Sequence, residues 1–274
     1  MKILCCDGGG CFGFAQAKIL QDSGCAEKFD CYVGTSIGSA VVSAIAMGKV
    51  SQVGQDFFDT WMPKIFKYSF WRAYNPFLSK YPDTELNNAL QSVFDGLSFG
   101  DAKKPLFVTA ANISATQLKV FSSMDVSDSS IPAWKVLRYA TAAETYFDPM
   151  DGYGDGGVFA NNPVMVAVAA ASKILGVPIN EMEILDIGTG ESQRSNGIPS
   201  WKLGWGKWLL EALLDGASDS MHNYFVKSLP VKKYVKIQFV RQPGWAMDKP
   251  ADMKQAEKDW QKDILNALPI VRAF

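Results

Sequence analysis

A serine in a glycine-rich turn is the first feature of the sequence that could do chemistry. Residues 34–38 read GTSIG, a G-x-S-x-G pattern centred on Ser36. This pattern typically presents a nucleophilic serine on a tight turn between a strand and a helix. The N-terminus of the following helix would lie beneath Ser36, where its dipole favours negative charge. The motif therefore predicts Ser36 as the nucleophile of an acyl transfer.

A second glycine-rich stretch lies upstream, where residues 7–10 read DGGG. Glycines let backbone N–H groups point at one spot, as the oxyanion hole of an acyl-transfer enzyme requires. We expect Gly8, Gly9 and Gly10 to supply these donors.

The same stretch also fits a dinucleotide-binding motif. Gly8, Gly10 and Gly13 satisfy G-x-G-x-x-G, but that fold needs an acidic residue at the end of the second strand. Asp30 has the right offset and instead opens the second strand, which runs into Ser36. We therefore disfavour a nicotinamide or flavin enzyme and expect no cofactor.

The nucleophile needs a base, and the chain offers two candidates. His222 is the single histidine and would give the order Ser, Asp, His found in α/β-hydrolases. It lies in a polar stretch without a glycine-rich turn to present it. Asp155 lies between Gly154 and Gly156, as a residue on a tight turn would. We favour Asp155 as the base and retain a His222-based esterase as the alternative.

The apolar runs that must position these residues predict alternating strands and helices. Strands are expected over Lys2–Cys6, Phe29–Val33, Leu106–Asn112, Leu118–Ser122, Glu183–Ile187 and Val235–Val240. Helices are expected over Gly13–Asp22, Ile37–Met47, Thr84–Phe94, Ala133–Ala143, Asn162–Leu175, Trp205–Leu214 and Ala251–Leu268. Most of the strands are continuous apolar runs, as strands covered on both faces are. We therefore expect an α/β fold with a mostly parallel central sheet of about six strands.

Composition limits the class of protein. The chain has 274 residues, of which 48% are hydrophobic, so a single catalytic domain over residues 1–274 is expected. A formal net charge of -1 gives no reason to expect a nucleic-acid partner. All five cysteines fall in the first 31 residues without a C-x-x-C pair, which indicates free thiols and no metal site. Without room for a signal peptide or a spanning segment, we expect a cytoplasmic protein that can contact membranes peripherally.

Two segments are unusually aromatic. Residues 57–81 hold ten aromatic residues, with four basic side chains against one acidic side chain, Asp59. Farther on, Trp201, Trp205 and Trp208 recur at helical spacing. Both segments could pack in the core, or form the wall of an acyl-chain pocket or a surface that contacts lipid.

Five motifs, taken in order, resemble the patatin-like phospholipases. They are DGGG at residues 7–10, GTSIG at 34–38, ATAA at 140–143 with Tyr146 and Phe147, DGG at 155–157 followed by NNP at 161–163, and ILDIGTG at 184–190. The resemblance covers most of the chain. It implies a three-layer α/β/α fold and the hydrolysis of phospholipids or other acyl lipids, without histidine, metal or cofactor.

The resemblance also implies roles for single residues. Ser36 would attack the ester carbonyl and Asp155 would take its proton. Gly8, Gly9 and Gly10 would hold the oxyanion, and water would then release the fatty acid from the acyl-enzyme. A catalytically silent protein that binds lipid or another partner is the alternative outside the enzyme class.

One position departs from the family pattern. The family's glycine block usually continues to an arginine before its last glycine, and here that position is Phe12. A neutral lipid substrate is therefore favoured over an anionic one. We also expect the backbone at this position to accept the long basic side chain of a Phe12→Arg variant.

Overall fold

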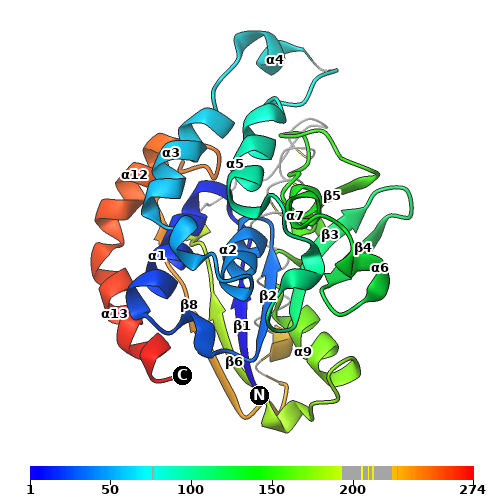
Figure 1. The fold of residues 1–274 in the computed structure, drawn as a ribbon. Coiled ribbons are helices and arrows are strands. Elements are labelled where there is room, and N and C mark those ends of the chain that lie inside the picture. Colours follow the sequence, from blue (N-terminus) through cyan, green and yellow to red (C-terminus); the bar gives the residue numbers. More distant parts are fainter. Residues whose placement is uncertain (76, 193–204, 206–208, 210–211, 213–223, 227) are drawn as a thin grey trace.

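A central sheet between two layers of helices forms the body of the molecule (Figure 1). The computed structural model describes residues 1–75, 77–192, 205, 209, 212, 224–226 and 228–274. The seven strands of the sheet are β1 (Lys2–Cys6), β2 (Cys31–Thr35), β3 (Leu106–Asn112), β4 (Gln117–Ser122), β5 (Tyr153–Asp155), β6 (Glu183–Ile187) and β8 (Lys233–Ile237). A separate short pair consists of β7 (Glu191–Ser192) and β9 (Val240–Arg241).

The sheet is mostly parallel, as the alternating sequence pattern predicts. Its order is β4-β3-β2-β1-β6-β8. Strands β1, β2, β3, β6 and β8 run parallel to one another. β4 and β5 both pair with β3 in the antiparallel sense. β1 therefore lies inside the sheet, with the strand that leads to Ser36 on one side and β6 on the other.

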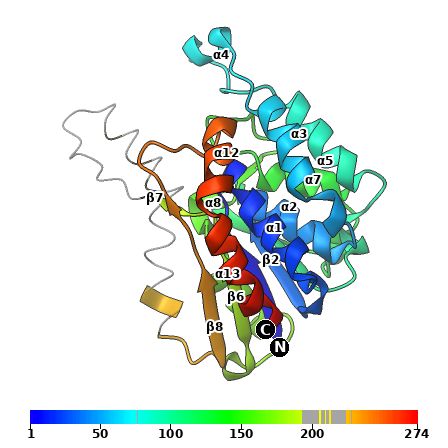
Figure 2. The same cartoon turned by 90° about the vertical axis from the view of Figure 1, so that its left-hand side faces the viewer.

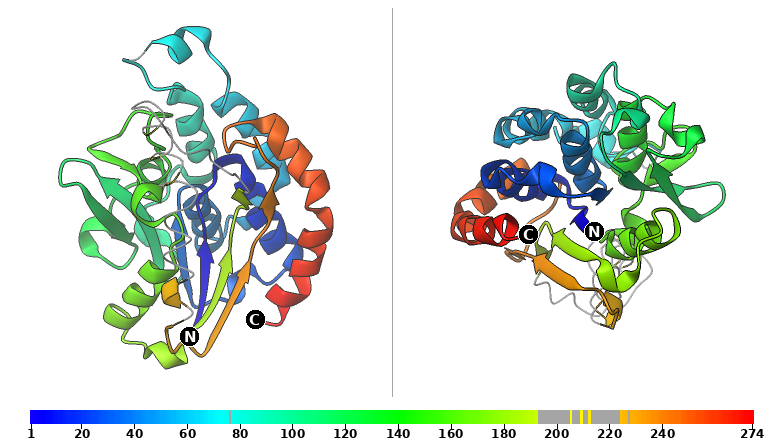
Figure 3. Two further views of the ribbon diagram at one scale, coloured as in Figure 1. Left: turned by 180° about the vertical axis from the view of Figure 1, so that it is seen from behind. Right: turned by 60° about the horizontal axis from the view of Figure 1, so that its bottom comes forward.

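Helices cover both faces of the sheet (Figures 2 and 3). One layer contains α1 (Phe14–Ser23), α2 (Ile37–Ala46), α3 (Gln55–Ile65), α5 (Thr84–Phe94), α7 (Ala133–Ala140), α12 (Pro250–Asp259) and α13 (Gln261–Arg272). On the opposite face lies α9 (Val164–Lys173). Shorter helices are α4 (Phe70–Tyr74), α6 (Val126–Ser129) and α8 (Gly157–Ala160). The expected three-layer α/β/α fold is confirmed.

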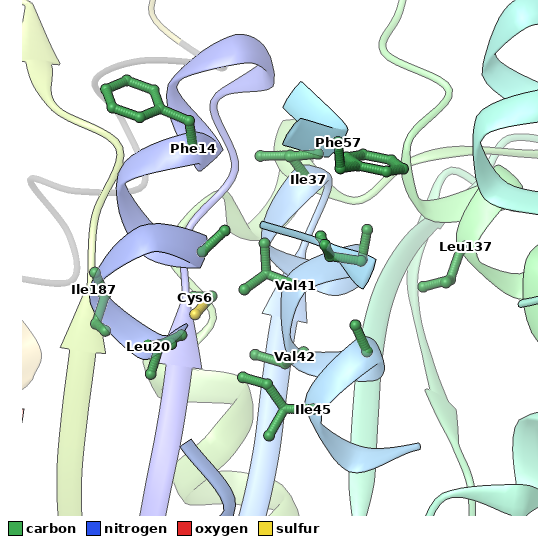
Figure 4. Close-up of a cluster of buried hydrophobic side chains, with 14 of the residues drawn as sticks. Cys6, Phe14, Leu20, Ile37, Val41, Val42, Ile45, Phe57, Leu137 and Ile187 are labelled. Carbon is green, nitrogen blue, oxygen red and sulfur yellow. The ribbon is translucent and has the colours of Figure 1, made fainter. Parts of the chain in front are cut away.

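Alternation along β1 divides the core into two clusters. Leu4 and Cys6 point into the larger cluster, which α1, α2 and α13 share, whereas Ile3 and Cys5 pack with α9. Figure 4 shows Cys6 among side chains of the larger cluster, with Ile37 and Phe57 together at its upper end. Because β1 has apolar side chains on both faces, it reads as a continuous hydrophobic run.

The structure corrects several predicted boundaries. The predicted helix Ala251–Leu268 is two helices, α12 and α13, which meet at Trp260, whose indole is buried. The predicted strand Val235–Val240 begins at Lys233 and ends at Ile237. The sequence analysis predicted no helix over α3, which contains Pro63. Trp201, Trp208 and most of the predicted helix Trp205–Leu214 lie outside the described residues.

Candidate active site

Ser36 lies on a sharp turn between β2 and α2. Its φ of 52° and ψ of -128° are strained for a residue with a side chain, as in the nucleophile elbows of hydrolases. The turn depends on close packing, because a Cβ on Gly38 would lie 2.2 Å from the carbonyl oxygen of Cys6. The backbone thus holds the Ser36 hydroxyl beside the carboxyl end of β1.

Asp155 reaches the same point from the end of β5. The hydroxyl of Ser36 donates a hydrogen bond to Asp155 Oδ2 at 2.5 Å. The other carboxylate oxygen, Oδ1, accepts the N–H of Gly157 at 2.8 Å. β5 is held in place by antiparallel pairing with β3, in which Asp155 lies opposite Ala110. The two residues proposed from the sequence are therefore brought together across 119 positions of the chain.

The surroundings of Asp155 make it a stronger base than a free aspartate. Burial raises the pKa of Asp155 to about 7, although its hydrogen bonds with Ser36 and Gly157 act in the opposite direction. Glu144 lies nearby, and burial together with the charge of Asp155 raises the pKa of Glu144 to about 8. A carboxylate with a pKa near the working pH is suited to general-base catalysis.

The glycine loop meets the serine but differs in detail from the prediction. The N–H of Gly8 donates to the carbonyl of Asn161 at 3.1 Å, so Gly8 is not available as an oxyanion donor. Gly8 is instead needed for close approach, since a Cβ there would lie 3.1 Å from Ser36 Cβ. Gly9 and Gly10 have φ of 154° and 54°, and no described residue accepts their N–H groups. The two remaining candidates for oxyanion donors are therefore Gly9 and Gly10.

Residues that sequence analysis missed hold this loop. Thr189 Oγ1 donates to the Gly8 carbonyl at 2.5 Å, and the carbonyl of Met247 accepts the N–H of Cys11 at 2.8 Å. Thr189 belongs to the ILDIGTG motif and could have been found there. Met247 and Glu144 carry no such signal, because only the folded chain brings them to the site.

An apolar pocket opens beside Ser36, and nearly all of its lining is hydrophobic. The lining residues are Gly10, Ser36, Ile37, Ala40, Phe57, Met62, Ile65, Phe66, Leu86, Ala89, Leu90, Thr141, Ala143, Tyr146, Phe147 and Met247. Such a pocket suits a long hydrocarbon chain and leaves few polar groups to bind anything else.

One part of the aromatic segment at residues 57–81 lines the pocket, and another part is exposed to solvent. Phe57 and Phe66 line the pocket. By contrast, Trp71 and Phe77 are 83% and 92% exposed. The pocket wall therefore accounts for one part of the segment, and neither the pocket wall nor core packing accounts for the exposed part.

Phe12 belongs to the core. It is fully buried, and its ring lies 6.0 Å from Trp245 and 5.5 Å from Trp260, measured between ring centroids. A charged side chain would have to enter this aromatic cluster. The expectation that Phe12→Arg is accepted is therefore revised.

The described residues also bear on metal binding, membrane spans and the cysteines. Among the residues it describes, no cluster of three acidic, cysteine or histidine side chains could hold a metal ion. Its described helices include none that is both long and apolar enough to span a bilayer. The five cysteines are buried free thiols. His222 lies outside the described residues.

Comparison with known proteins decides the family. Residues 4–168, more than half of the chain, match the family described as patatin-like phospholipase. The chain belongs to the patatin-like phospholipase family. It is 27% identical over 228 residues to the 85/88 kDa calcium-independent phospholipase A2 of Rattus norvegicus, covering 69% of this chain but 27% of the relative. It is 24% identical over 227 residues to the cGAMP-activated phospholipase of Vibrio cholerae, covering 69% of this chain and 64% of the relative.

A solved structure is also similar to this patatin-like chain. The crystal structure of VipD from Legionella pneumophila aligns with 98% of this chain and 66% of its own, at 13% identity and a TM-score of 0.48.

Proposed function

We propose that this protein is a lipid acyl hydrolase that cleaves carboxylic esters of phospholipids or other acyl lipids with a Ser36–Asp155 dyad. The observation that carries the proposal is the 2.5 Å hydrogen bond from Ser36 to Asp155 at the edge of an apolar pocket. Membership of the patatin-like phospholipase family and the similarity to named phospholipases support the lipid substrate.

The reaction proceeds in two steps. Asp155 accepts the hydroxyl proton as Ser36 Oγ attacks the ester carbonyl, and the N–H groups of Gly9 and Gly10 stabilise the oxyanion. The protonated Asp155 then gives its proton to the leaving alcohol, which departs as the acyl-enzyme forms. Water attacks the acyl-enzyme while Asp155 takes a proton from this water. Asp155 then returns that proton to Ser36 Oγ as the bond from the acyl carbon to Oγ breaks and the fatty acid leaves.

The pocket determines which part of the substrate is bound. Its hydrophobic lining accommodates the acyl chain, while the ester carbonyl lies between Ser36 and the glycine loop. Burial of hydrocarbon contributes about 0.8 kcal/mol per methylene, so a pocket of this kind favours long chains over short ones. The headgroup lies outside the pocket.

We also propose one catalytic domain over residues 1–274. The larger core cluster contains residues from Leu4 to Phe274, and α1 packs against α13. Limited proteolysis tests this proposal, because a single domain should not yield two separately stable fragments.

A fluorophosphonate probe separates the enzyme from a silent lipid-binding protein. The probe should label the wild-type chain at Ser36 and leave Ser36→Ala unlabelled. Dispersions of phospholipids and neutral lipids should then release free fatty acid with the wild-type chain and not with Ser36→Ala. Absence of both labelling and fatty acid from a folded protein would reject the hydrolase and favour the silent protein.

A further inference from the structure

A projecting arm carries the most exposed aromatic residues of the described chain. The α4 arm, residues 67–75 and 77–80, leaves the end of α3 and extends beyond the body of the molecule (Figure 1). Trp71 and Phe77 within it are 83% and 92% exposed, and Tyr68 is 62% exposed. Large aromatic side chains with this much exposure to solvent indicate an interaction surface.

The arm is internally ordered. Arg72 Nη1 donates to the carbonyl of Ser79 at 3.1 Å and to its hydroxyl at 3.2 Å. These bonds join the outgoing part of the arm, which contains α4, to the returning part. Trp71 and Phe77 are therefore exposed on an arm whose two parts are bonded to each other.

The charge of the arm is of one sign. No acidic residue occurs from position 60 to position 82. Lys64 at the end of α3, and Lys67, Arg72 and Lys80 of the arm, lie in this interval, and Lys80 is paired with the buried Asp248. Lys64 and Lys67 are exposed. Aromatic residues flanked by lysine and arginine match the boundary between headgroups and acyl chains, where aromatic rings enter and cations remain with the phosphates.

Both ends of the arm are attached to the wall of the acyl pocket. Phe66, which lines the pocket, precedes the arm, and its ring lies 5.2 Å from the ring of Tyr81, which follows the arm. On the returning side, the N–H of Tyr81 donates to the carbonyl of Tyr146 at 2.8 Å, and Tyr146 also lines the pocket. A surface that holds the arm therefore lies next to the pocket.

We propose that the α4 arm inserts Trp71 and Phe77 into the headgroup region of a lipid bilayer containing anionic lipid, and so holds the acyl pocket at the membrane. Membrane binding is inferred from the arm alone. The contribution of this binding to catalysis rests on the proposed function. The exposed Lys64 and Lys67 bind anionic lipid of the surface, which is separate from the lipid that is cleaved.

Vesicle sedimentation tests the membrane binding without requiring hydrolysis. The full chain carrying Ser36→Ala is mixed with phosphatidylcholine vesicles, with or without phosphatidylserine. Trp71→Ala with Phe77→Ala should lower the partition coefficient on phosphatidylserine vesicles by about tenfold or more. Lys64→Glu with Lys67→Glu should lower it as well, and added salt should reduce this charge effect.

Matched controls remove exposed apolar groups or reverse charge elsewhere on the surface. Val126→Ala with Leu265→Ala removes exposed side chains outside the arm, and Lys258→Glu with Lys262→Glu makes the same charge change on α12 and α13. Both controls should bind vesicles like the parent chain. The proposal is overturned if the variant with Trp71→Ala and Phe77→Ala binds the vesicles as well as the parent chain does. It is also overturned if the controls lose as much binding as the arm variants.

Two further measurements distinguish the other outcomes. On a short water-soluble ester, Trp71→Ala with Phe77→Ala should retain wild-type turnover when Ser36 is present, while turnover on vesicles falls. If no ester is cleaved but vesicle binding depends on the arm, the proposed function fails and the membrane contact stands. If the arm variant instead abolishes self-association in sedimentation velocity and leaves vesicle binding unchanged, the arm is a protein contact and the proposal is wrong.

Discussion

The guanidinium of Arg241 lies over the ring of Phe12, with Cζ 5.3 Å from the ring centroid. Arg241 is 3% exposed, and its Nε donates to the carbonyl of Gly190 at 2.6 Å. A cation therefore reaches the buried side of the glycine loop from β9, while Phe12 occupies the position where the family usually has arginine. A cation over an aromatic face is stabilising, and more so when both groups are removed from water.

Phe12→Arg should destabilise the protein by at least about 3 kcal/mol, because it places a second cation beside Arg241 in an aromatic cluster. Phe12→Leu should lower the free energy of unfolding by about half as much or less, since it keeps the site apolar. Thermal and urea melts of the two variants measure the difference. An arginine variant that melts within about 2 °C of wild type would show that the cluster can open to admit the charge.

Ser36→Ala and Asp155→Asn should each reduce turnover by about a thousandfold or more, and the double variant should be no worse than either one, because the dyad acts as a unit. His222→Ala should retain most of the activity. Steady-state hydrolysis by variants whose folding is checked by circular dichroism is the measurement. A folded but inactive His222→Ala, beside an active Asp155→Asn, would replace the dyad with a triad.

The activity should fall on both sides of a narrow pH range. Asp155 must be ionised to act as a base, so turnover should decline as the pH drops through about 7. Ionisation of Glu144 above about pH 8 adds a negative charge near Asp155. This charge opposes the negative charge that develops on the substrate and should lower turnover again. Glu144→Gln should remove the upper decline and leave the lower one in place.

The measurement is kcat/KM against pH for wild type and Glu144→Gln. An unchanged upper decline in the variant would exclude Glu144 as its cause. The lower decline cannot by itself distinguish Asp155 from a histidine, because a pKa raised to about 7 lies close to the ordinary histidine value of about 6.5. The His222→Ala variant is therefore needed beside the profile.

Asp155→Asn should stabilise the fold at neutral and alkaline pH. The pKa of Asp155 is raised in the folded state above its unfolded value of about 3.9, so the folded chain holds the proton more tightly. The stability from this proton is fully present below about pH 3.9 and is lost as the pH rises through about 7. Relative to wild type, the variant should gain roughly 1–3 kcal/mol between pH 5 and pH 8. Melting curves at the two pH values check this, and a gain that is equal at both would contradict it.

Ala89→Leu should shorten the preferred acyl chain. Ala89 is buried in α5 and lines the pocket, so a larger side chain takes space from the substrate. The ratio of kcat/KM for long-chain to short-chain esters should fall by about tenfold, since each methylene that is excluded forfeits about 0.8 kcal/mol of burial. Ala267→Leu in α13 is the control, because it overpacks the core away from the pocket. Equal ratios in the two variants would show that the pocket does not hold the chain.

Local sequence patterns predicted most of the elements that carry the site. The runs over Lys2–Cys6 and Leu106–Asn112 became strands with those bounds, and Thr84–Phe94 became a helix with those bounds. The reason is that each run is apolar or amphipathic over its whole length, so burial selects one structure. The glycine spacing around Ser36 likewise predicts its turn, since the packing needs are local.

Contacts between distant segments could not be predicted in this way. β5 has three residues, too few for a recognisable pattern, although it carries Asp155. The bond between the Gly8 N–H and the Asn161 carbonyl joins segments whose approach depends on the whole sheet. The raised pKa of Glu144 depends on burial, which a polar residue in a loop does not reveal.

The pairing of the sheet also sets when a growing chain can become active during its synthesis. Asp155 and its strand emerge from the ribosome 119 positions after Ser36. The loop that faces Ser36 is completed by Thr189, and its N-terminal strand β1 pairs with β6 at residues 183–187. A nascent chain that ends before these residues has Ser36 without Asp155 or the finished loop. Translation itself therefore leaves this site unfinished until the segment with β6 and Thr189 has been made.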